Sequence, residues 1–138
     1  MCGIFGTINH KLENKEDIIL RGLRHRGPDE QNFIEKNSVQ LFHTRLAIQD
    51  LTESGRQPMT HNGIIISFNG EIYNHFELRK KYNLKHSSRS DTMTILLMYE
   101  KMGMNMLSEF DGMFAFCLYD TNTKKVYLAR DRAGKKPL

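Results

Sequence analysis

Two segments of the sequence read as strands whose two faces are both largely apolar, and this strongly limits the folds that the chain can adopt. In the segment 39–48, one face carries Val39, Leu41, His43 and Arg45, and the other carries Phe42, Thr44 and Leu46. The segment 113–119 is likewise apolar on both faces. A strand that is covered on both faces belongs to a sheet packed between two other layers. We therefore expect a sheet that is sandwiched between layers of secondary structure.

Helices are expected to supply part of that cover. Their apolar stripes and end signals predict helices over 16–26, 76–82 and 91–101, with one or two further turns over 105–110. Gly27-Pro28 stops the first helix and Gly103 stops the third, which begins at a cap formed by Ser90 or Asp91. Many of the eight methionines fall between Met93 and Met113, where they are expected to fill the core of the helical layer.

Further strands are expected at 2–9, 32–35, 64–68 and 125–129. The strand 64–68 is expected to stop at Asn69-Gly70, because this pair favours turns. The segment 50–63 contains Gly55, Pro58 and Asn62-Gly63 and is expected to be a long loop. Long loops in small domains often carry function.

Length and composition indicate one domain of a globular protein. The chain has 138 residues and 39% hydrophobic residues, and its mean hydropathy is -0.53. Neither a membrane span nor a secretory signal is expected, since no apolar run approaches the required ~18 residues and the start lacks the order of a signal peptide. The two cysteines, Cys2 and Cys117, cannot form a disulfide framework. We therefore expect a cytoplasmic protein with free thiols and no membrane partner.

The net charge of +4 and the pI near 9.1 raise the question of nucleic-acid binding. The basic side chains that cluster in the sequence are Arg79, Lys80, Lys81, Lys85 and Arg89. This cluster is small and has no aromatic residues at a spacing suited to base stacking. We expect it to be a solvated basic face, and we expect no nucleic-acid partner.

Cys2 is the first candidate for chemistry, because it lies directly behind the initiator methionine. Removal of Met1 leaves a thiol and a free α-amino group on the same residue. Such an amine titrates near pH ~7.7 to 8.0, so part of it is unprotonated at neutral pH and can take the thiol proton. This arrangement is a known way to activate a nucleophile.

Other polar residues suggest what this nucleophile would attack. Arg45 at the end of an apolar face needs an anion partner, and Glu71 and Asp91 could receive an ammonium group. Together these charges suit a free amino acid. Asn69 and the backbone of Gly70 offer two donors to a developing oxyanion. The residues therefore suggest acyl transfer from an amino-acid side chain, provided that they meet in space.

At this point the chain resembles a known family. The motifs, in chain order, are Met1-Cys2-Gly3-Ile4-Phe5-Gly6, Arg24-His25-Arg26-Gly27-Pro28-Asp29, His43-Thr44-Arg45-Leu46-Ala47-Ile48, Phe68-Asn69-Gly70-Glu71-Ile72-Tyr73-Asn74, Ser90-Asp91-Thr92, Asp111-Gly112-Met113-Phe114-Ala115-Phe116 and Arg130-Asp131-Arg132. They occur in the order found in class II glutamine amidotransferase domains, and the chain looks most like the asparagine synthetase branch. The match spans nearly the whole chain.

The resemblance implies an N-terminal-nucleophile hydrolase fold, an α+β sandwich with four layers, αββα, and two antiparallel sheets. The implied reaction is hydrolysis of the glutamine side-chain amide to glutamate and ammonia. By position, Cys2 would be the nucleophile that forms a γ-glutamyl thioester, and its α-amine would be the general base and then the acid. Asn69 and the Gly70 N–H would form the oxyanion hole.

The resemblance also implies how L-glutamine would be bound. Arg45 would hold its α-carboxylate, and Glu71 and Asp91 would hold its α-ammonium group. Backbone groups around Ile48 would line the same pocket. No metal and no cofactor are expected in this domain.

The family pattern has two departures near the end of the chain, where Ala133 and Lys135 replace an aromatic and an aliphatic residue. Family members normally continue into a synthetase domain, where ATP and Mg are expected to act, and residues 1–138 would be the glutaminase domain alone. We therefore expect a C-terminally truncated chain whose missing synthetase domain is its partner. The resemblance also allows a homodimer of the full-length protein.

Several alternatives stay open. The chain could bind glutamine without hydrolysing it, or it could be an N-terminal-nucleophile amidase for another amide. The ammonia could also serve a sugar acid or another carboxylate instead of aspartate. His25 or His43 could form a dyad with Cys2, although structural hydrogen bonds are the expected role of both histidines. Cys117 is expected to be a small core residue.

Overall fold

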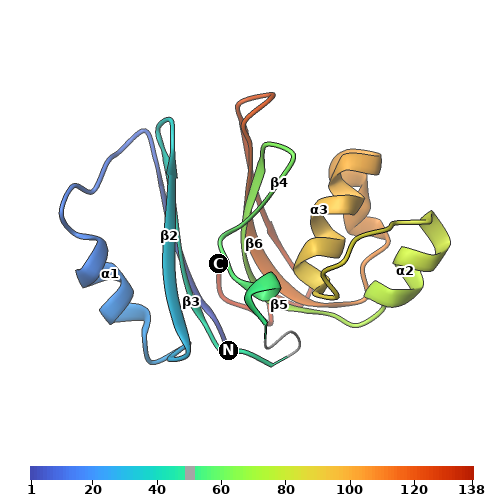
Figure 1. Cartoon of the computed structure of the whole chain (residues 1–138), viewed down its shortest axis with the longest axis horizontal. Coiled ribbons are helices and arrows are strands. Elements are labelled where there is room, and N and C mark those ends of the chain that lie inside the picture. The colour runs from blue at the N-terminus through green and yellow to red at the C-terminus, as the bar shows by residue number, and fades with distance from the viewer. Residues whose placement is uncertain (49–51) are drawn as a thin grey trace.

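The computed structural model describes residues 1–48 and 52–138, which form two antiparallel sheets flanked by helices (Figure 1). The first sheet has the order β1-β3-β2, with β1 Gly3–Ile8, β3 Val39–Arg45 and β2 Glu30–Lys36. The second sheet has the order β4-β5-β6-β7, with β4 Met59–His61, β5 Ile64–Ile72, β6 Gly112–Asp120 and β7 Lys125–Arg130. The helices are α1 Glu16–Leu23, α2 His75–Tyr82 and α3 Asp91–Met102, with 3-10 turns η1 Glu53–Gly55 and η2 Gly103–Ser108.

The elements stack in layers. Figure 1 shows α1 outside the first sheet, the two sheets face to face, and α2 and α3 outside the second sheet. The expected α+β sandwich of two antiparallel sheets is thus confirmed. Among the described residues, no helix has the length and apolar character that a membrane crossing needs.

The two-sided strand 39–48 behaves as its pattern predicts, although it ends at Arg45. Val39 and Leu41 face the second sheet and pack against Ile65 and Tyr119. On the opposite face, the hydroxyl of Thr44 donates to the carbonyl of Leu23 in α1, at 3.0 Å. Helix α1 ends at that residue, not at Arg26 as expected, because the chain turns there to follow the end of β3.

The second sheet is built on the alternation of β5. Its even-numbered side chains, Ile64, Ile66, Phe68 and Ile72, enter the core beneath α3, and its odd-numbered side chains face the first sheet. The expected stop at Asn69-Gly70 is wrong, because β6 pairs with β5 without interruption from Ile64 to Ile72. Gly70 permits this pairing, since a Cβ atom there would overlap the backbone of Met113 and Phe114. The strand therefore carries Asn69, Gly70 and Glu71 in a rigid ladder.

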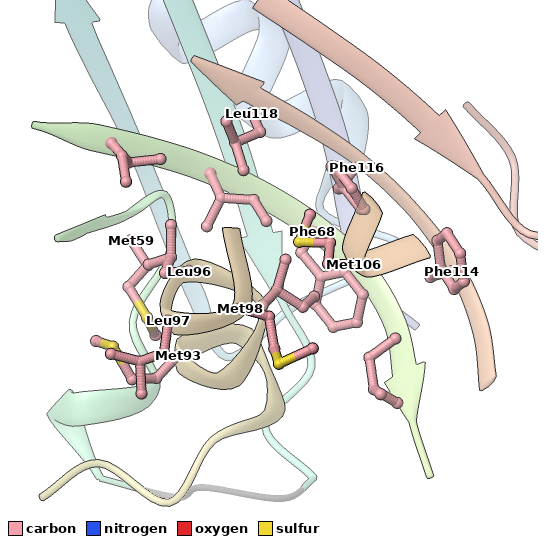
Figure 2. Close-up of a cluster of buried hydrophobic side chains, with 14 of the residues drawn as sticks. Met59, Phe68, Met93, Leu96, Leu97, Met98, Met106, Phe114, Phe116 and Leu118 are labelled. Atoms are coloured by element: carbon pink, nitrogen blue, oxygen red, sulfur yellow. The ribbon is translucent and has the colours of Figure 1, made fainter. Parts of the chain in front are cut away.

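Helix α3 closes the larger core (Figure 2). Figure 2 shows Met93, Leu96, Leu97 and Met98 of α3 against Phe68, Phe114, Phe116 and Leu118 of the second sheet. Each of these side chains is buried, and full burial of one contributes about 1.5–3 kcal/mol. The Ser90 side chain, and not that of Asp91, caps the helix by accepting from the N–H of Met93 at 3.1 Å. The cap leaves the Asp91 carboxylate for other contacts.

Two other expectations need correction. The segment 52–63 is not a plain loop, because it contains η1 and the short strand β4, which adds to the edge of β5. Arg79 does not belong to a solvated basic face: its guanidinium donates to the carbonyls of Ser88 and Ser90 at 2.6 and 2.9 Å. This arginine therefore holds the segment that leads into α3.

Candidate active site

Cys2 precedes β1 and faces the space between the two sheets. Alternation along β1 places Cys2 on the same face as Ile4, which is paired with His43 of β3. The thiol lies 3.9 Å from the carbonyl oxygen of Leu46, and the Nε of Arg26 donates to the carbonyl oxygen of Cys2 at 3.1 Å. Both neighbours come from segments that the family resemblance singled out, so these segments fix the position of the thiol.

A cavity of about 150 Å³ opens beside Cys2. All the candidate site residues line it, namely Cys2, Arg45, Ile48, Asn69, Gly70, Glu71 and Asp91. They come from the start of the chain, from β3, from β5 and from the start of α3. The fold thus brings together the residues that the sequence could only nominate one by one. The roles that the resemblance assigns to them stay predictions.

The backbone N–H of Gly70 is aimed at this cavity. The N–H of Phe68 donates to Gln57 Oε1 at 2.7 Å, and the N–H of Ile72 donates to Asp91 Oδ2 at 3.1 Å. Both hydrogen bonds leave β5 at the edge opposite β6. Successive N–H groups alternate in direction along a paired strand, so the N–H of Gly70 points to that same edge, between these two bonds. The position suits a donor to an oxyanion.

Asp91 presents a buried carboxylate to the cavity. It accepts hydrogen bonds from the N–H groups of Ile72 at 3.1 Å and Thr92 at 2.8 Å. Burial, assisted by the negative charge of Glu71, outweighs these bonds and raises the pKa of Asp91 from 3.8 to about 6. A positively charged ligand would relieve this cost of burying the ionised carboxyl group.

Arg45 has the anion partner that its burial requires, and the partner is Glu30. Arg45 Nη1 lies 2.9 Å from Glu30 Oε2 and 3.3 Å from the carbonyl oxygen of Thr52. Arg56 Nε bonds the other oxygen of Glu30, also at 2.9 Å. Burial alone would raise the pKa of Glu30, but the hydrogen bonds from the two arginines outweigh it and lower that pKa. Glu30 thus joins Arg45 to the segment that leads to Gln57.

The thiol of Cys2 needs help to ionise. Burial raises the pKa of this thiol above its ordinary value of 9.0, although the Leu46 carbonyl contact, the chain terminus and Arg45 oppose the shift. Each of the two candidate histidines instead contacts a backbone carbonyl oxygen. His43 is buried with Nε2 at 3.1 Å from the carbonyl oxygen of Phe68, and His25 Nδ1 lies 3.0 Å from that of Gly22. These contacts are the structural hydrogen bonds that were expected, and they argue against a Cys-His dyad.

His43 makes the stability of the fold depend on pH. Burial lowers the pKa of His43 from 6.5 to about 4. Between pH 6.5 and pH 4, His43 is therefore protonated in the unfolded chain but neutral in the folded protein. The contribution to stability is complete above pH 6.5 and is lost as the pH falls toward 4. We expect His43 to account for a loss of about 2 kcal/mol between pH 7 and pH 5.

Urea unfolding at the two pH values checks this expectation. The matched variant is His43→Gln, which keeps a donor for the carbonyl of Phe68 but does not titrate. We expect the variant to lose less stability than the wild type between pH 7 and pH 5. Equal losses in the two proteins would show that His43 is not the source.

Sequence reasoning missed four residues around the cavity. Arg26 holds the carbonyl of Cys2, Glu30 pairs with Arg45, and Gln57 spans β5 and α3, its Nε2 donating to Thr92 Oγ1 at 3.3 Å. Lys136 lines the cavity near the end of the chain. Arg26 and Lys136 lie in segments that match the family pattern and could have been singled out, whereas a lone Glu or Gln carries no sequence signal.

Cys117 lies at the edge of the core and not within it. It is half-buried and packs against the small cluster between the sheets, and burial raises the pKa of its thiol to about 11. Within residues 1–48 and 52–138, no three His, Cys, Asp or Glu side chains are grouped as metal ligands would be. The expectation that the domain uses no metal or cofactor stays a prediction.

Comparisons with known proteins identify the family of this chain. A family model described as a glutamine amidotransferase domain matches residues 1–138. Three similar proteins are an asparagine synthetase (glutamine-hydrolyzing) 2 of Oryza sativa subsp. japonica at 43% identity, one of Zea mays at 40% and asparagine synthetase B of Escherichia coli at 37%. Each covers 100% of this chain, and the chain covers 24%, 25% and 26% of them.

Across the curated relatives that match most strongly, the chain spans between 20% and 31% of their length. The shared part is thus one portion of a larger protein in each relative. Because the family model covers every residue from 1 to 138, the assignment applies to the whole chain. The chain belongs to the glutamine amidotransferase domain family, a family of glutamine-hydrolysing enzymes whose matching members here are asparagine synthetases.

Proposed function

We propose that this domain hydrolyses the side-chain amide of L-glutamine, with Cys2 as the nucleophile. The observation that carries the proposal is the gathering of Cys2, Asn69, Gly70 and charged side chains of both signs around one small cavity. The family membership and the layered fold support an N-terminal-nucleophile hydrolase. A thiol whose pKa is raised by burial needs a base close by, and the α-amine of Cys2 is that base once Met1 is removed.

The proposed reaction proceeds in two halves. The α-amine takes the thiol proton as Sγ attacks the amide carbon, and the oxygen of the resulting tetrahedral intermediate accepts bonds from the Asn69 side chain and the Gly70 N–H. The protonated amine then gives its proton to the leaving nitrogen, which departs as ammonia and leaves a γ-glutamyl thioester. Water, activated by the same amine, hydrolyses the thioester and releases glutamate.

Charged residues in the cavity wall would recognise a free amino acid. Arg45 would bind the α-carboxylate, and Asp91 with Glu71 would bind the α-ammonium group. Ile48 lines the mouth with an exposed side chain, in keeping with a backbone role. Residues 49–51 lie outside the described part of the structure.

The direct test is to incubate the protein, freed of Met1, with glutamine and to measure glutamate. Analogues that lack the α-carboxylate or carry a blocked α-amine should be poor substrates, because they lose the interaction with Arg45 or with Asp91. If the analogues are hydrolysed as fast as glutamine, the protein is an amidase for other amides. Binding of glutamine without glutamate would indicate a binding domain and would contradict the proposal.

The affinity for glutamine is expected to fall in acid through Asp91. Since the pKa of Asp91 is raised to about 6, the carboxylate that receives the ammonium group is ionised at pH 7 and largely protonated at pH 5. We expect affinity to drop roughly tenfold between these pH values. Calorimetry on the inactive Cys2→Ala variant measures binding without turnover. The double variant that also carries Asp91→Asn should bind weakly at both pH values, and a tenfold drop that persists in it would exclude Asp91 as the cause.

The ammonia is proposed to serve an ATP-dependent ligase region of the asparagine synthetase type, with Mg and ATP acting there and not in this domain. Aspartate is the expected acceptor, because the relatives are named for asparagine synthesis. A reducing, cytoplasmic location suits the free thiol of Cys2. The test supplies the protein, joined to its ligase region, with ATP, Mg, glutamine and a mixture of aspartate and other carboxylic acids, and identifies the amidated product. Asparagine is the expected product, whereas an amidated sugar acid or another amidated carboxylate would correct the acceptor.

A further inference from the structure

Lys136 is a buried lysine in the wall of the cavity. Its side chain and backbone together are 5% exposed, whereas its neighbour Lys135 is exposed. Lysine is rarely buried without an anion to pair with. In the described part of the chain no carboxylate lies within ion-pair distance of Lys136, and its ammonium donates to the sulfur of Met1 at 3.0 Å. A thioether is a weak acceptor, so this contact does not by itself explain the burial.

The backbone of Lys136 is fixed independently of Met1. Its N–H donates to Asp131 Oδ2 at 3.1 Å, and that same oxygen accepts from the N–H of Phe114 in β6 at 3.1 Å. The carbonyl of Lys136 accepts from Arg130 Nε at 2.5 Å. Removal of Met1 therefore leaves Lys136 in the cavity wall and takes away the group that its ammonium contacts.

We propose that Lys136 is a positioning residue for the reaction: after Met1 is removed, its ammonium lies near the new α-amino group of Cys2 and disfavours protonation of that amine. The inference rests on the proposed function, in which this amine is the base. Met1 is covalently bonded to Cys2, and its sulfur lies 3.0 Å from Lys136 Nζ. The length of the methionine side chain and backbone therefore places Lys136 Nζ within roughly 10 Å of the Cys2 nitrogen.

The other charges of the site make such a cation useful. Among residues 1–48 and 52–138, the charged groups that contact Cys2 or line its cavity are Arg26, Arg45, Glu71, Asp91 and Lys136. The two carboxylates, which receive the ammonium group of glutamine, would also stabilise a protonated α-amine on Cys2 and so block the base. A cation next to the amine opposes this effect. Two unit charges at this separation in a partly buried site shift a proton equilibrium by roughly half to one pH unit.

The test is the pH dependence of kcat/KM in the protein freed of Met1. Lys136→Met removes the charge with little change in volume and should move the acid limb upward by roughly half to one pH unit. Activity should then fall roughly three- to tenfold at acid pH and recover at alkaline pH. Lys136→Arg keeps the charge and should follow the wild type. Lys135→Met is the matched control, because it removes an exposed charge one residue away, and it should also follow the wild type.

A second measurement does not depend on activity. The chain contains two cysteines, so labelling with α-¹³C cysteine gives two NMR signals, and only that of Cys2 reports on an α-amine. Its titration midpoint should rise in Lys136→Met and not in Lys135→Met. An unchanged midpoint, or a kcat/KM that falls equally at every pH, would overturn the inference. If the α-amine of Cys2 in the wild-type protein titrates at a lower pH than in Lys136→Met but the wild type makes no glutamate, the proposed function would be overturned instead.

Discussion

Replacing Cys2 with alanine is expected to lower the rate of glutamine hydrolysis by at least roughly 10³-fold, because the variant has no atom that can form the thioester. The fold should survive, since Cys2 precedes β1 and its side chain borders the cavity. Glutamine binding should therefore persist, because the residues proposed to bind it, Arg45, Glu71 and Asp91, are unchanged. Glutamate release and calorimetric binding, measured on the same preparation, separate the two effects.

Cys117→Ser is the matched control for this variant. Cys117 is also half-buried between the sheets, but it lines a different cavity, with Ile4 and Ser67. Its loss should leave the glutaminase rate unchanged. If Cys2→Ala retains activity while Cys117→Ser loses it, the wrong thiol has been assigned.

The second large effect is expected at Asn69. Its side chain is buried on the face of β5 that looks toward the first sheet, and it lines the cavity. Replacing Asn69 with alanine would remove one of the two proposed oxyanion donors, and loss of such a donor typically lowers kcat by roughly 10²- to 10³-fold. The KM for glutamine should change little, because the donor acts on the tetrahedral intermediate more than on the bound amide. Steady-state kinetics on the two proteins gives both parameters.

Ser67→Ala provides the control on the same strand face. Ser67 lies two residues before Asn69, is equally buried, and donates its hydroxyl to the carbonyl of Phe42 at 3.0 Å. Its loss should cost some stability without changing kcat. Comparable losses of kcat in both variants would point to general damage of β5, and an unchanged kcat in Asn69→Ala would remove Asn69 from the oxyanion hole.

Period-two alternation made much of the fold predictable from sequence. The strand 39–45 is buried on both faces, and its apolar pattern showed that other layers must cover it. The strand 64–72 shows the limit of such reasoning. Local propensity places a turn at Asn69-Gly70, but continuous pairing with β6 overrides it. Which partner strand is present, and how long it runs, is a property of tertiary structure.

Some residues of the candidate site could be predicted from the sequence and others could not. Residues with a distinctive chemical type or motif, such as Cys2, Arg45 and Asp91, could be nominated from sequence, and the fold brings them to one cavity. Glu30 and Gln57 could not, because each acts through a contact to a residue at least 11 positions away. Side chains whose role is to hold others in place become visible only when the partners are known.

Cys2 is proposed to carry both the nucleophile and its base, and intact-mass measurement combined with the glutaminase assay tests this pairing. Protein whose mass shows that Met1 is absent should hydrolyse glutamine and, when stopped early, should carry a glutamyl adduct on Cys2. Protein that retains Met1 has its Cys2 nitrogen in a peptide bond and should be inactive. Glutamine hydrolysis at a comparable rate by protein that retains Met1 would show that the α-amine of Cys2 is not the base.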